Sequence, residues 1–226
     1  MEQTQIDKET FESHGGFDQS TIKEKYNELS SHYEEVYTTV GWPDPEKTAE
    51  KAIKFGFNAD SKVLDMGCGT GMVAMHLKNK SQVTSMNIIG MDASEGMIEK
   101  AKKKELYTEI HNQFLCKPEE FKTNYPHYLG TFDFVLASGL LAEGHATNEV
   151  FDEMLMSLKV GGYAVFTSRV EYLTSLHYQE GMDERVTSGK WELVDEEEYE
   201  KYSNAKDSPV GRFKPTISKV FTYRKL

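Results

Sequence analysis

Three glycines, Gly67, Gly69 and Gly71, lie two residues apart in the stretch KVLDMGCGTGMVAMHL, which spans residues 62–77. A short apolar run that ends in Asp65 precedes them, and a run with a helical pattern follows them. A glycine-rich turn between a strand and a helix can approach a ligand closely, because no Cβ stands in the way. These residues therefore predict a turn that holds a nucleotide-like ligand.

The spacing of the glycines argues against a dinucleotide. The dinucleotide fingerprint is G-x-G-x-x-G, but Met72 takes the place of its third glycine and Gly71 comes one residue early. Asp65 suits a ligand with a positive charge or an amino group better than it suits a pyrophosphate. An NAD-dependent dehydrogenase is therefore only a remote alternative for this chain.

A second acid, Asp92, ends the next apolar run, NIIGMD, twenty-one residues after Gly71. An acid at the end of the second strand of such a sheet accepts hydrogen bonds from ribose hydroxyls. The alternative is that Asp92 caps the helix that follows it, a role for which Ser94 competes. The turn of small residues and Asp92 together predict an adenosine-containing ligand.

Strands and helices that could position these residues alternate along the chain. Apolar runs predict strands at 63–65, 87–92, 113–116, 132–138 and 163–169, with helices predicted at 72–79, 95–106, 119–124 and 148–158. Regular alternation of this kind predicts an α/β fold with a doubly wound, mostly parallel sheet.

The two ends of the chain have different patterns. Apolar residues at helical spacing predict helices at 21–38, 45–57 and 170–184. Residues 191–194 and 216–224 predict an antiparallel hairpin at the sheet edge, and the acidic run 195–200 between them predicts solvated surface. We expect a flexible N-terminus over 1–20, N-terminal helices over 21–58 and the main domain over 59–226.

Composition narrows the class of protein. The chain has 226 residues, enough for one α/β domain with a full core. A net charge of −11 argues against nucleic acid and anionic membranes as partners. Two cysteines suit a reducing compartment, and no apolar window reaches the length of a transmembrane helix. We expect a cytoplasmic or nuclear-soluble protein that is a monomer or a weak homodimer.

The motifs resemble those of a known family. VLDMGCGTG, GMDASEGMIEKAKKK, FDFVLASG and LKVGGYAVF are similar, in this order, to the successive motifs of the class I S-adenosylmethionine-dependent methyltransferases. The resemblance implies a seven-stranded Rossmann-like sheet, S-adenosylmethionine as methyl donor and S-adenosylhomocysteine as product. It implies a small-molecule or protein acceptor, which the motifs leave unidentified. No set of His, Asp or Glu has the spacing of metal ligands, so we expect no metal. The alternative is a non-catalytic scaffold of this fold, or a subunit of a larger assembly.

The resemblance also implies roles for single residues. Helices within 21–58 would form a lid, with Tyr26 and Tyr33 on one face of one helix. Cys116 stands where the family often has an adenine-binding Asp at the end of the third strand, so backbone groups would recognise adenine there. The full set of expected cofactor contacts is Tyr26, Tyr33, Asp65, Gly67, Cys68, Gly69, Asp92, Ala93, Met97, Cys116 and Ser138.

Two residues are candidates for work on the acceptor. His145 follows the fourth predicted strand and suits a general base or a substrate contact, the alternative being a surface histidine. Arg169 ends the fifth predicted strand and suits a carboxylate or phosphate of the substrate, the alternative being an ion pair within the protein. Methyl transfer needs alignment of its reactants and no nucleophile on the enzyme. We therefore expect no more distinctive catalytic motif in the sequence than these two residues.

Overall fold

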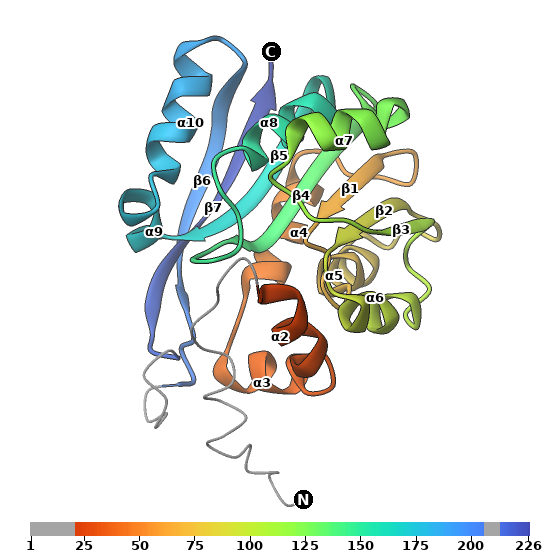
Figure 1. The fold of residues 1–226 in the computed structure, drawn as a ribbon, viewed down its shortest axis with the longest axis vertical. Helices are drawn as coiled ribbons and strands as arrows, with labels where there is room; N and C mark the ends of the chain where they lie inside the picture. The colour runs from red at the N-terminus through yellow and green to blue at the C-terminus, as the bar shows by residue number, and fades with distance from the viewer. Residues whose placement is uncertain (1–20, 206–212) are drawn as a thin grey trace, which may run out of the picture.

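The computed structural model describes residues 21–205 and 213–226; the flexible terminus expected over 1–20 lies outside these ranges. One sheet with the strand order β3-β2-β1-β4-β5-β7-β6 runs through the molecule (Figure 1). The strands are β1 Lys62–Met66, β2 Asn87–Asp92, β3 Glu109–Asn112, β4 Phe132–Leu141, β5 Leu158–Arg169, β6 Trp191–Lys201 and β7 Thr216–Lys225. Strands β1 to β5 pair in parallel, whereas β7 is antiparallel to both β5 and β6. The seven-stranded, mostly parallel sheet and its antiparallel hairpin are confirmed.

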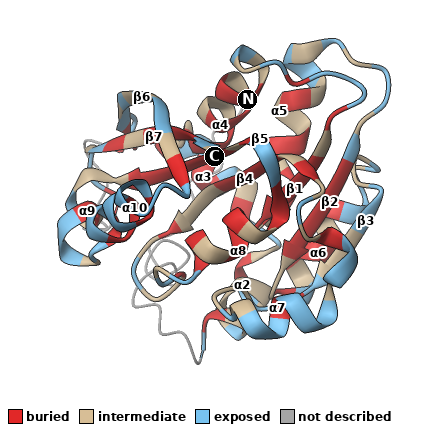
Figure 2. Cartoon of the chain, turned by 90° about the horizontal axis from the view of Figure 1, so that it is seen from above, coloured by how far each residue is buried: buried red, intermediate tan, exposed pale blue. Residues whose placement is uncertain are grey.

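Helices cover both faces of this sheet (Figure 2). They are α2 Ile22–Leu29, α3 Tyr33–Val40, α4 Asp44–Lys54, α5 Met72–Ser81, α6 Glu95–Lys102, α7 Pro118–Asn124, α8 Val150–Ser157, α9 Val170–Ser175 and α10 Tyr178–Thr187, with a short 3-10 turn η1 at Pro126–Tyr128. α4 and α5 pack on one face, and α7, α8 and α10 pack on the other. The central strands are buried from both sides, which explains their nearly continuous apolar sequences.

The helix predicted over 21–38 is two helices, α2 and α3, that meet at a sharp turn. The polar run Ser30-Ser31-His32 separates them, and the Ser30 hydroxyl donates a hydrogen bond to the carbonyl of Asn27 at 2.8 Å. Such local side-chain bonds compete with helix continuation. The single helix predicted over 170–184 is likewise broken into α9 and α10, at His177, whose φ is +58°.

The third strand lies at Glu109–Asn112, so the prediction of 113–116 was wrong. Its position is set by pairing with β2, in which Asp92 lies opposite Asn112. The chain leaves the sheet at Gln113, whose N–H donates to the carbonyl of Asp92 at 2.9 Å. The sequence QFLC is more apolar than EIHN, but β3 is an edge strand and tolerates polar residues.

The acidic run 195–200 belongs to β6, which continues to Lys201, and does not connect two strands as predicted. Carboxylates on its inward side contact lysines of α4, whereas Glu196 and Glu198 contact Lys219 of β7 at 3.1 Å and 3.7 Å. Lys51 contacts Asp195 at 2.6 Å and Glu197 at 2.9 Å, and Lys47 contacts Glu197 at 2.7 Å. Lysines of α4 therefore neutralise the inward side of this strand, while Glu196, Glu198 and Glu200 are exposed.

Candidate functional site

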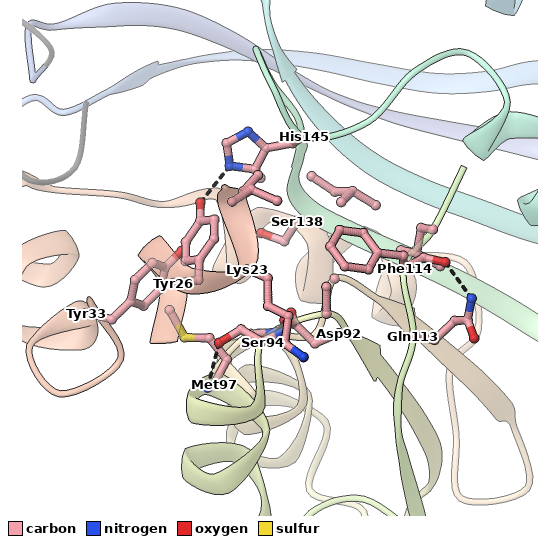
Figure 3. Close-up of a pocket in the computed structure, with 17 residues that line it drawn as sticks. Lys23, Tyr26, Tyr33, Asp92, Ser94, Met97, Gln113, Phe114, Ser138 and His145 are labelled. Carbon is pink, nitrogen blue, oxygen red and sulfur yellow. Dashed lines mark hydrogen bonds between the residues drawn. The ribbon is translucent and has the colours of Figure 1, made fainter. Parts of the chain in front are cut away.

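A cavity of about 710 Å³ opens at the carboxyl ends of β1, β2 and β4, where ligands bind in sheets of this type. Tyr26 and Tyr33 lie on the side of the α2–α3 segment and Phe114 faces them from the far side, with Asp92 between (Figure 3). Its lining residues come from α2, α3, α6 and the ends of the strands with the segments that follow them: Ile22, Lys23, Tyr26, Tyr33, Gly67, Gly69, Asp92, Ala93, Ser94, Met97, Gln113, Phe114, Leu115, Ser138, Gly139, Leu140 and His145.

The glycine turn forms one wall of this cavity with its backbone. All three glycines have positive φ, at +69°, +53° and +87°, a region that side chains disfavour. A Cβ on Gly67 would meet Leu140 at 3.1 Å, whereas a Cβ on Gly69 would meet no atom within 4 Å. The turn therefore needs glycine for its conformation, and open space lies beside Gly69 for a ligand.

Asp92 joins the glycine turn to the start of α6. One carboxylate oxygen accepts the N–H of Gly69 and the other accepts the N–H of Ser94, both at 2.8 Å. Burial raises the pKa of Asp92, and these two N–H groups partly offset that effect. A carboxylate has about four lone-pair sites, so Asp92 retains acceptor capacity for ligand hydroxyls.

Ser94, and not Asp92, caps the N-terminus of α6. The Ser94 side chain accepts a hydrogen bond from the Met97 N–H at 3.2 Å, which is the N-cap contact of α6. Asp92 is thereby left to position the turn and to face the cavity.

Tyr26 and Tyr33 lie on two helices, not on one helix face as predicted, yet their ring centroids are 6.0 Å apart. The Tyr26 hydroxyl lies 2.7 Å from Nε2 of His145, and Nδ1 of His145 lies 2.7 Å from the carbonyl of Glu143. A carbonyl only accepts, so Nδ1 carries the proton in the neutral ring and Nε2 presents a lone pair to Tyr26. His145 therefore offers a proton acceptor at the cavity wall.

Polar contacts hold α2 and α3 over the cavity. The Asn27 side-chain oxygen accepts from the Ser94 hydroxyl at 2.7 Å and from the Gly96 N–H at 3.0 Å. Lys104 connects the same region to the turn, because its ammonium pairs with Glu34 and donates to the Thr70 carbonyl at 2.7 Å. These contacts attach α2 and α3 to the start of α6 and to the glycine turn, and their role as a lid stays a prediction.

Among the predicted cofactor contacts, Tyr26, Tyr33, Gly67, Gly69, Asp92, Ala93, Met97 and Ser138 line the cavity, as does His145. Asp65 does not line it. The Asp65 carboxylate is buried behind the turn and accepts a hydrogen bond from the Tyr107 hydroxyl at 2.7 Å. The structure thus does not place Asp65 where it could hold a ligand amino group.

Both cysteines also lie away from the lining. Cys68 is buried, and a Cβ on Gly90 would meet its sulfur at 3.0 Å, so it packs between strands. Burial raises the pKa of the Cys68 thiol, which suits an inert packing role. Cys116 follows the segment 113–115 that does line the cavity, and its N–H bonds to Glu153 at 2.9 Å. Cys116 was predicted as a cofactor contact because the third strand was predicted at 113–116, four residues later than it lies.

Several lining residues were missed by sequence reasoning. Phe114 and Leu115 line the cavity because β3 ends at Asn112, whereas the strand predicted at 113–116 would have put them inside the sheet. Phe114 is a large apolar side chain that is 37% exposed, and an exposed apolar ring directly after a strand is the signal that could have found it. Lys23 lies on α2 and reaches the same space (Figure 3); nothing in its sequence context marks it.

These residues suit S-adenosylmethionine. The cavity supplies a carboxylate for ribose hydroxyls at Asp92, an apolar wall for adenine at Phe114 and Leu115, and an open backbone face at Gly69. The Ser138 hydroxyl has no hydrogen-bond partner among the described residues, so a ligand polar group could satisfy it. The described part of the chain shows no group of three or more His, Cys, Asp or Glu that could hold a metal ion.

We expect the stability of the protein to depend on pH through Asp65. Burial raises the pKa of Asp65 to about 7, against which the Tyr107 hydrogen bond acts. The folded protein then keeps a proton that the unfolded chain has lost, so the free energy of unfolding falls as pH rises from about 4 to about 7. Asp65→Asn removes this dependence and should gain on the order of 2 kcal/mol over wild type by pH 8.

Urea unfolding of both proteins at several pH values measures this difference. The gain of Asp65→Asn over wild type should grow across the window and then level off. A difference that stays constant with pH would show that the Asp65 carboxylate does not change its proton affinity on folding.

Residues 63–162 match the sequence model of a family described as a methyltransferase domain. No curated protein matches the chain significantly. Within the described ranges, every helix is too short or too polar to span a membrane.

Three solved structures illustrate the likeness in fold. The [4+2]-cyclase SpnF is 14% identical, with a TM-score of 0.65, and the match covers 93% of this chain and 99% of that one. A Thermotoga maritima S-adenosylmethionine-dependent methyltransferase, described as a possible histamine N-methyltransferase, is 18% identical over 89% and 98%, with a TM-score of 0.55. A TehB-like S-adenosylmethionine-dependent methyltransferase from Corynebacterium glutamicum is 18% identical over 79% and 88%, with a TM-score of 0.51. Identities this low establish the fold, and a cyclase among them shows that the fold hosts more than one reaction.

Proposed function

We propose, from the premise that residues 63–162 form a methyltransferase domain, that this chain transfers a methyl group from S-adenosylmethionine to a small-molecule acceptor. The observation that carries the proposal is the juxtaposition of Asp92 and the open backbone at Gly69 in one cavity beneath α2 and α3. Bound S-adenosylmethionine would supply the activated methyl group, with S-adenosylhomocysteine as product.

Each part of the donor has residues that suit it. Asp92 suits the ribose hydroxyls, and Phe114 with Leu115 suits the adenine ring. Gly67, Gly69 and Tyr33 line the same cavity and suit the methionine end. Burial raises the pKa of Tyr33, so its hydroxyl stays protonated and can donate a hydrogen bond there.

His145 suits the acceptor side of the cavity. Its Nδ1–H donates to the Glu143 carbonyl, which fixes the ring and leaves the Nε2 lone pair toward Tyr26. An acceptor that displaces the Tyr26 hydroxyl could pass its proton to Nε2. The contribution of the chain is then to position the acceptor, to take its proton and to exclude water.

A finer likeness concerns the residues around this site. Tyr26 and Tyr33, the GWPDP segment, GLLAEGHA and Arg169 are similar to motifs of the methyltransferase-like protein of the Williams–Beuren syndrome chromosomal region. We infer a shared lid and acceptor-loop arrangement with that protein, on the strength of these motifs alone.

The proposal is tested by following the methyl group. The purified protein is incubated with S-adenosylmethionine carrying an isotopic label in its methyl group, together with a small-molecule extract of cells. Label should appear in the small-molecule fraction with wild type and should be absent with Asp92→Ala. Label found in the protein fraction alone would mean that the acceptor is a protein and not a small molecule. Binding of S-adenosylhomocysteine without any transfer would favour the scaffold alternative.

His145→Ala separates donor binding from work on the acceptor. We expect its affinity for S-adenosylhomocysteine to stay within about twofold of wild type, because its polar contacts run to Tyr26 and Glu143. Its transfer of label should fall. Calorimetric titration with S-adenosylhomocysteine measures the first quantity; a large loss of affinity would place His145 on the donor side.

A further inference from the structure

A second cavity, of about 450 Å³, adjoins the first one. The two share Tyr26, Tyr33, Gly139 and His145 as a common wall. The second cavity reaches from this wall to the ends of β4, β5 and β6, and its remaining lining is Tyr37, Trp42, Asp44, Leu141, Ala142, Thr167, Ser168, Arg169, Tyr172, Lys201 and Tyr202. If the first cavity holds the methyl donor, as proposed above, the second is the space for the acceptor.

Charge in this second cavity is unbalanced. Its described lining contains three charged side chains: Asp44, Lys201 and Arg169. Asp44 and Lys201 form an ion pair at 2.7 Å, and both side chains are less than 10% exposed. They neutralise each other, which leaves the positive charge of Arg169 facing the cavity.

Arg169 is held in a way that suits recognition of an anion. Its guanidinium lies 5.3 Å from the ring centroids of both Tyr172 and Tyr202, and its side chain is 15% exposed. Contact with the two rings holds the guanidinium in place, and its fork of N–H donors is suited to a carboxylate. Glu171 contacts Nη1 at 3.0 Å but lies outside the lining and is 57% exposed, so water screens this pair.

The rest of the lining is rich in aromatic rings, which suit a planar body. Five tyrosines and Trp42 belong to it, and the ring centroids of Tyr33 and Trp42 lie 5.9 Å apart with the two rings at a right angle. A single guanidinium whose one carboxylate partner lies outside the lining matches one carboxylate of a ligand, whereas a phosphate dianion calls for further cations or N–H donors. The positive charge of Arg169 and the aromatic rings of the lining therefore both suit a small planar molecule with one carboxylate.

We propose that the second cavity binds a small planar monocarboxylate as the methyl acceptor, with its carboxylate on Arg169 and its accepting group toward His145. The acceptor role rests on the proposed function, while the carboxylate site rests on the contacts of Arg169 alone. Aromatic rings of the cavity hold the body of the molecule, and the wall shared with the first cavity places its accepting group near the methyl donor.

The test compares charged and neutral probes of the same shape. Wild type is titrated with 4-hydroxybenzoate, 4-hydroxybenzamide and 4-hydroxyphenyl phosphate, in the presence of S-adenosylhomocysteine, by ligand-observed NMR. The benzoate should bind at least about tenfold more tightly than the amide. Arg169→Gln should abolish this preference and leave the affinity for the amide unchanged. Glu171→Gln is the matched control, which should strengthen benzoate binding by releasing Nη1.

Four results would overturn the proposal. One is equal affinity for the benzoate and the amide, and a second is a benzoate preference that survives Arg169→Gln. The third is tighter binding of the phosphate than of the benzoate, and the fourth is no binding of the benzoate at all. Titration of S-adenosylhomocysteine in the same samples keeps the two proposals apart, because the donor site can fail while the carboxylate site binds its probe, and the reverse.

Discussion

Replacing Asp92 by alanine is expected to weaken binding of S-adenosylhomocysteine by at least about tenfold, and by up to about a hundredfold. The carboxylate would lose its contacts with ribose hydroxyls, and hydrogen bonds to a charged group contribute about 1.5–3 kcal/mol each. The turn would also loosen, because the N–H groups of Gly69 and Ser94 lose their acceptor. Calorimetric titration of both proteins measures the change.

Asp133 supplies the matched control for this substitution. Its carboxylate also accepts a backbone N–H, from Lys62 at 2.8 Å, and an ammonium, from Lys159 at 2.9 Å. It lies near the start of β4, at the end of the sheet remote from the cavity. Asp133→Ala should lower stability and leave affinity for S-adenosylhomocysteine unchanged. Equal affinity of wild type and Asp92→Ala would show that Asp92 only shapes the turn.

Removing one member of the Asp44–Lys201 pair is expected to lower the free energy of unfolding by about 3–5 kcal/mol. The pair joins the first residue of α4 to the last residue of β6, and Thr167 donates to the same Asp44 oxygen at 3.2 Å. Both Lys201→Met and Asp44→Asn leave a buried polar or charged group without its partner. Urea unfolding measures each single variant.

The double variant Asp44→Asn with Lys201→Met decides the cause of this loss. It should cost less than the sum of the single variants by about 2 kcal/mol or more, because neither charge is then left alone. Arg224→Ala breaks the surface pair with Glu192, whose side chains are 46% and 41% exposed, and should cost no more than about 1 kcal/mol. Additive losses in the double variant would mean that the two residues contribute independently.

Local patterns were enough to predict the turn and its neighbours. Gly67, Gly69 and Asp92 lie within thirty residues of one another in the sequence, and the order of strand, tight turn and helix in that stretch was enough to predict where they lie. The alternation of apolar runs likewise predicted the parallel sheet. These parts of the fold depend on residues close together in the chain.

Contacts between distant residues were beyond the sequence. Pairing with β2 sets the place of β3, which moved the cavity wall to Phe114 and removed Cys116 from it. The Asp65 carboxylate points toward the Tyr107 hydroxyl, and Tyr107 lies forty-two residues away in the sequence, outside all the motifs quoted above. The acidic run of β6 finds its lysines on α4, 144 residues away in the case of Lys51 and Asp195.

Arg169 shows the same limit at the acceptor side. Its position at the end of a strand suggested a substrate contact, and the structure places it in the second cavity and not in the first. Both the ion pair with Glu171 and the cavity lining are present, so neither alternative from the sequence excludes the other. Its guanidinium contacts Tyr172 of α9 and Tyr202, which directly follows β6; no local pattern indicates that these segments meet.

The most direct test of the central claim is calorimetric titration of the purified chain with S-adenosylhomocysteine. We expect saturable binding at about one ligand per chain, with no binding of NAD under the same conditions, because the turn lacks the dinucleotide spacing. A folded protein that takes up no S-adenosylhomocysteine, or that binds NAD in its place, would contradict the assignment of the cavity beneath α2 and α3.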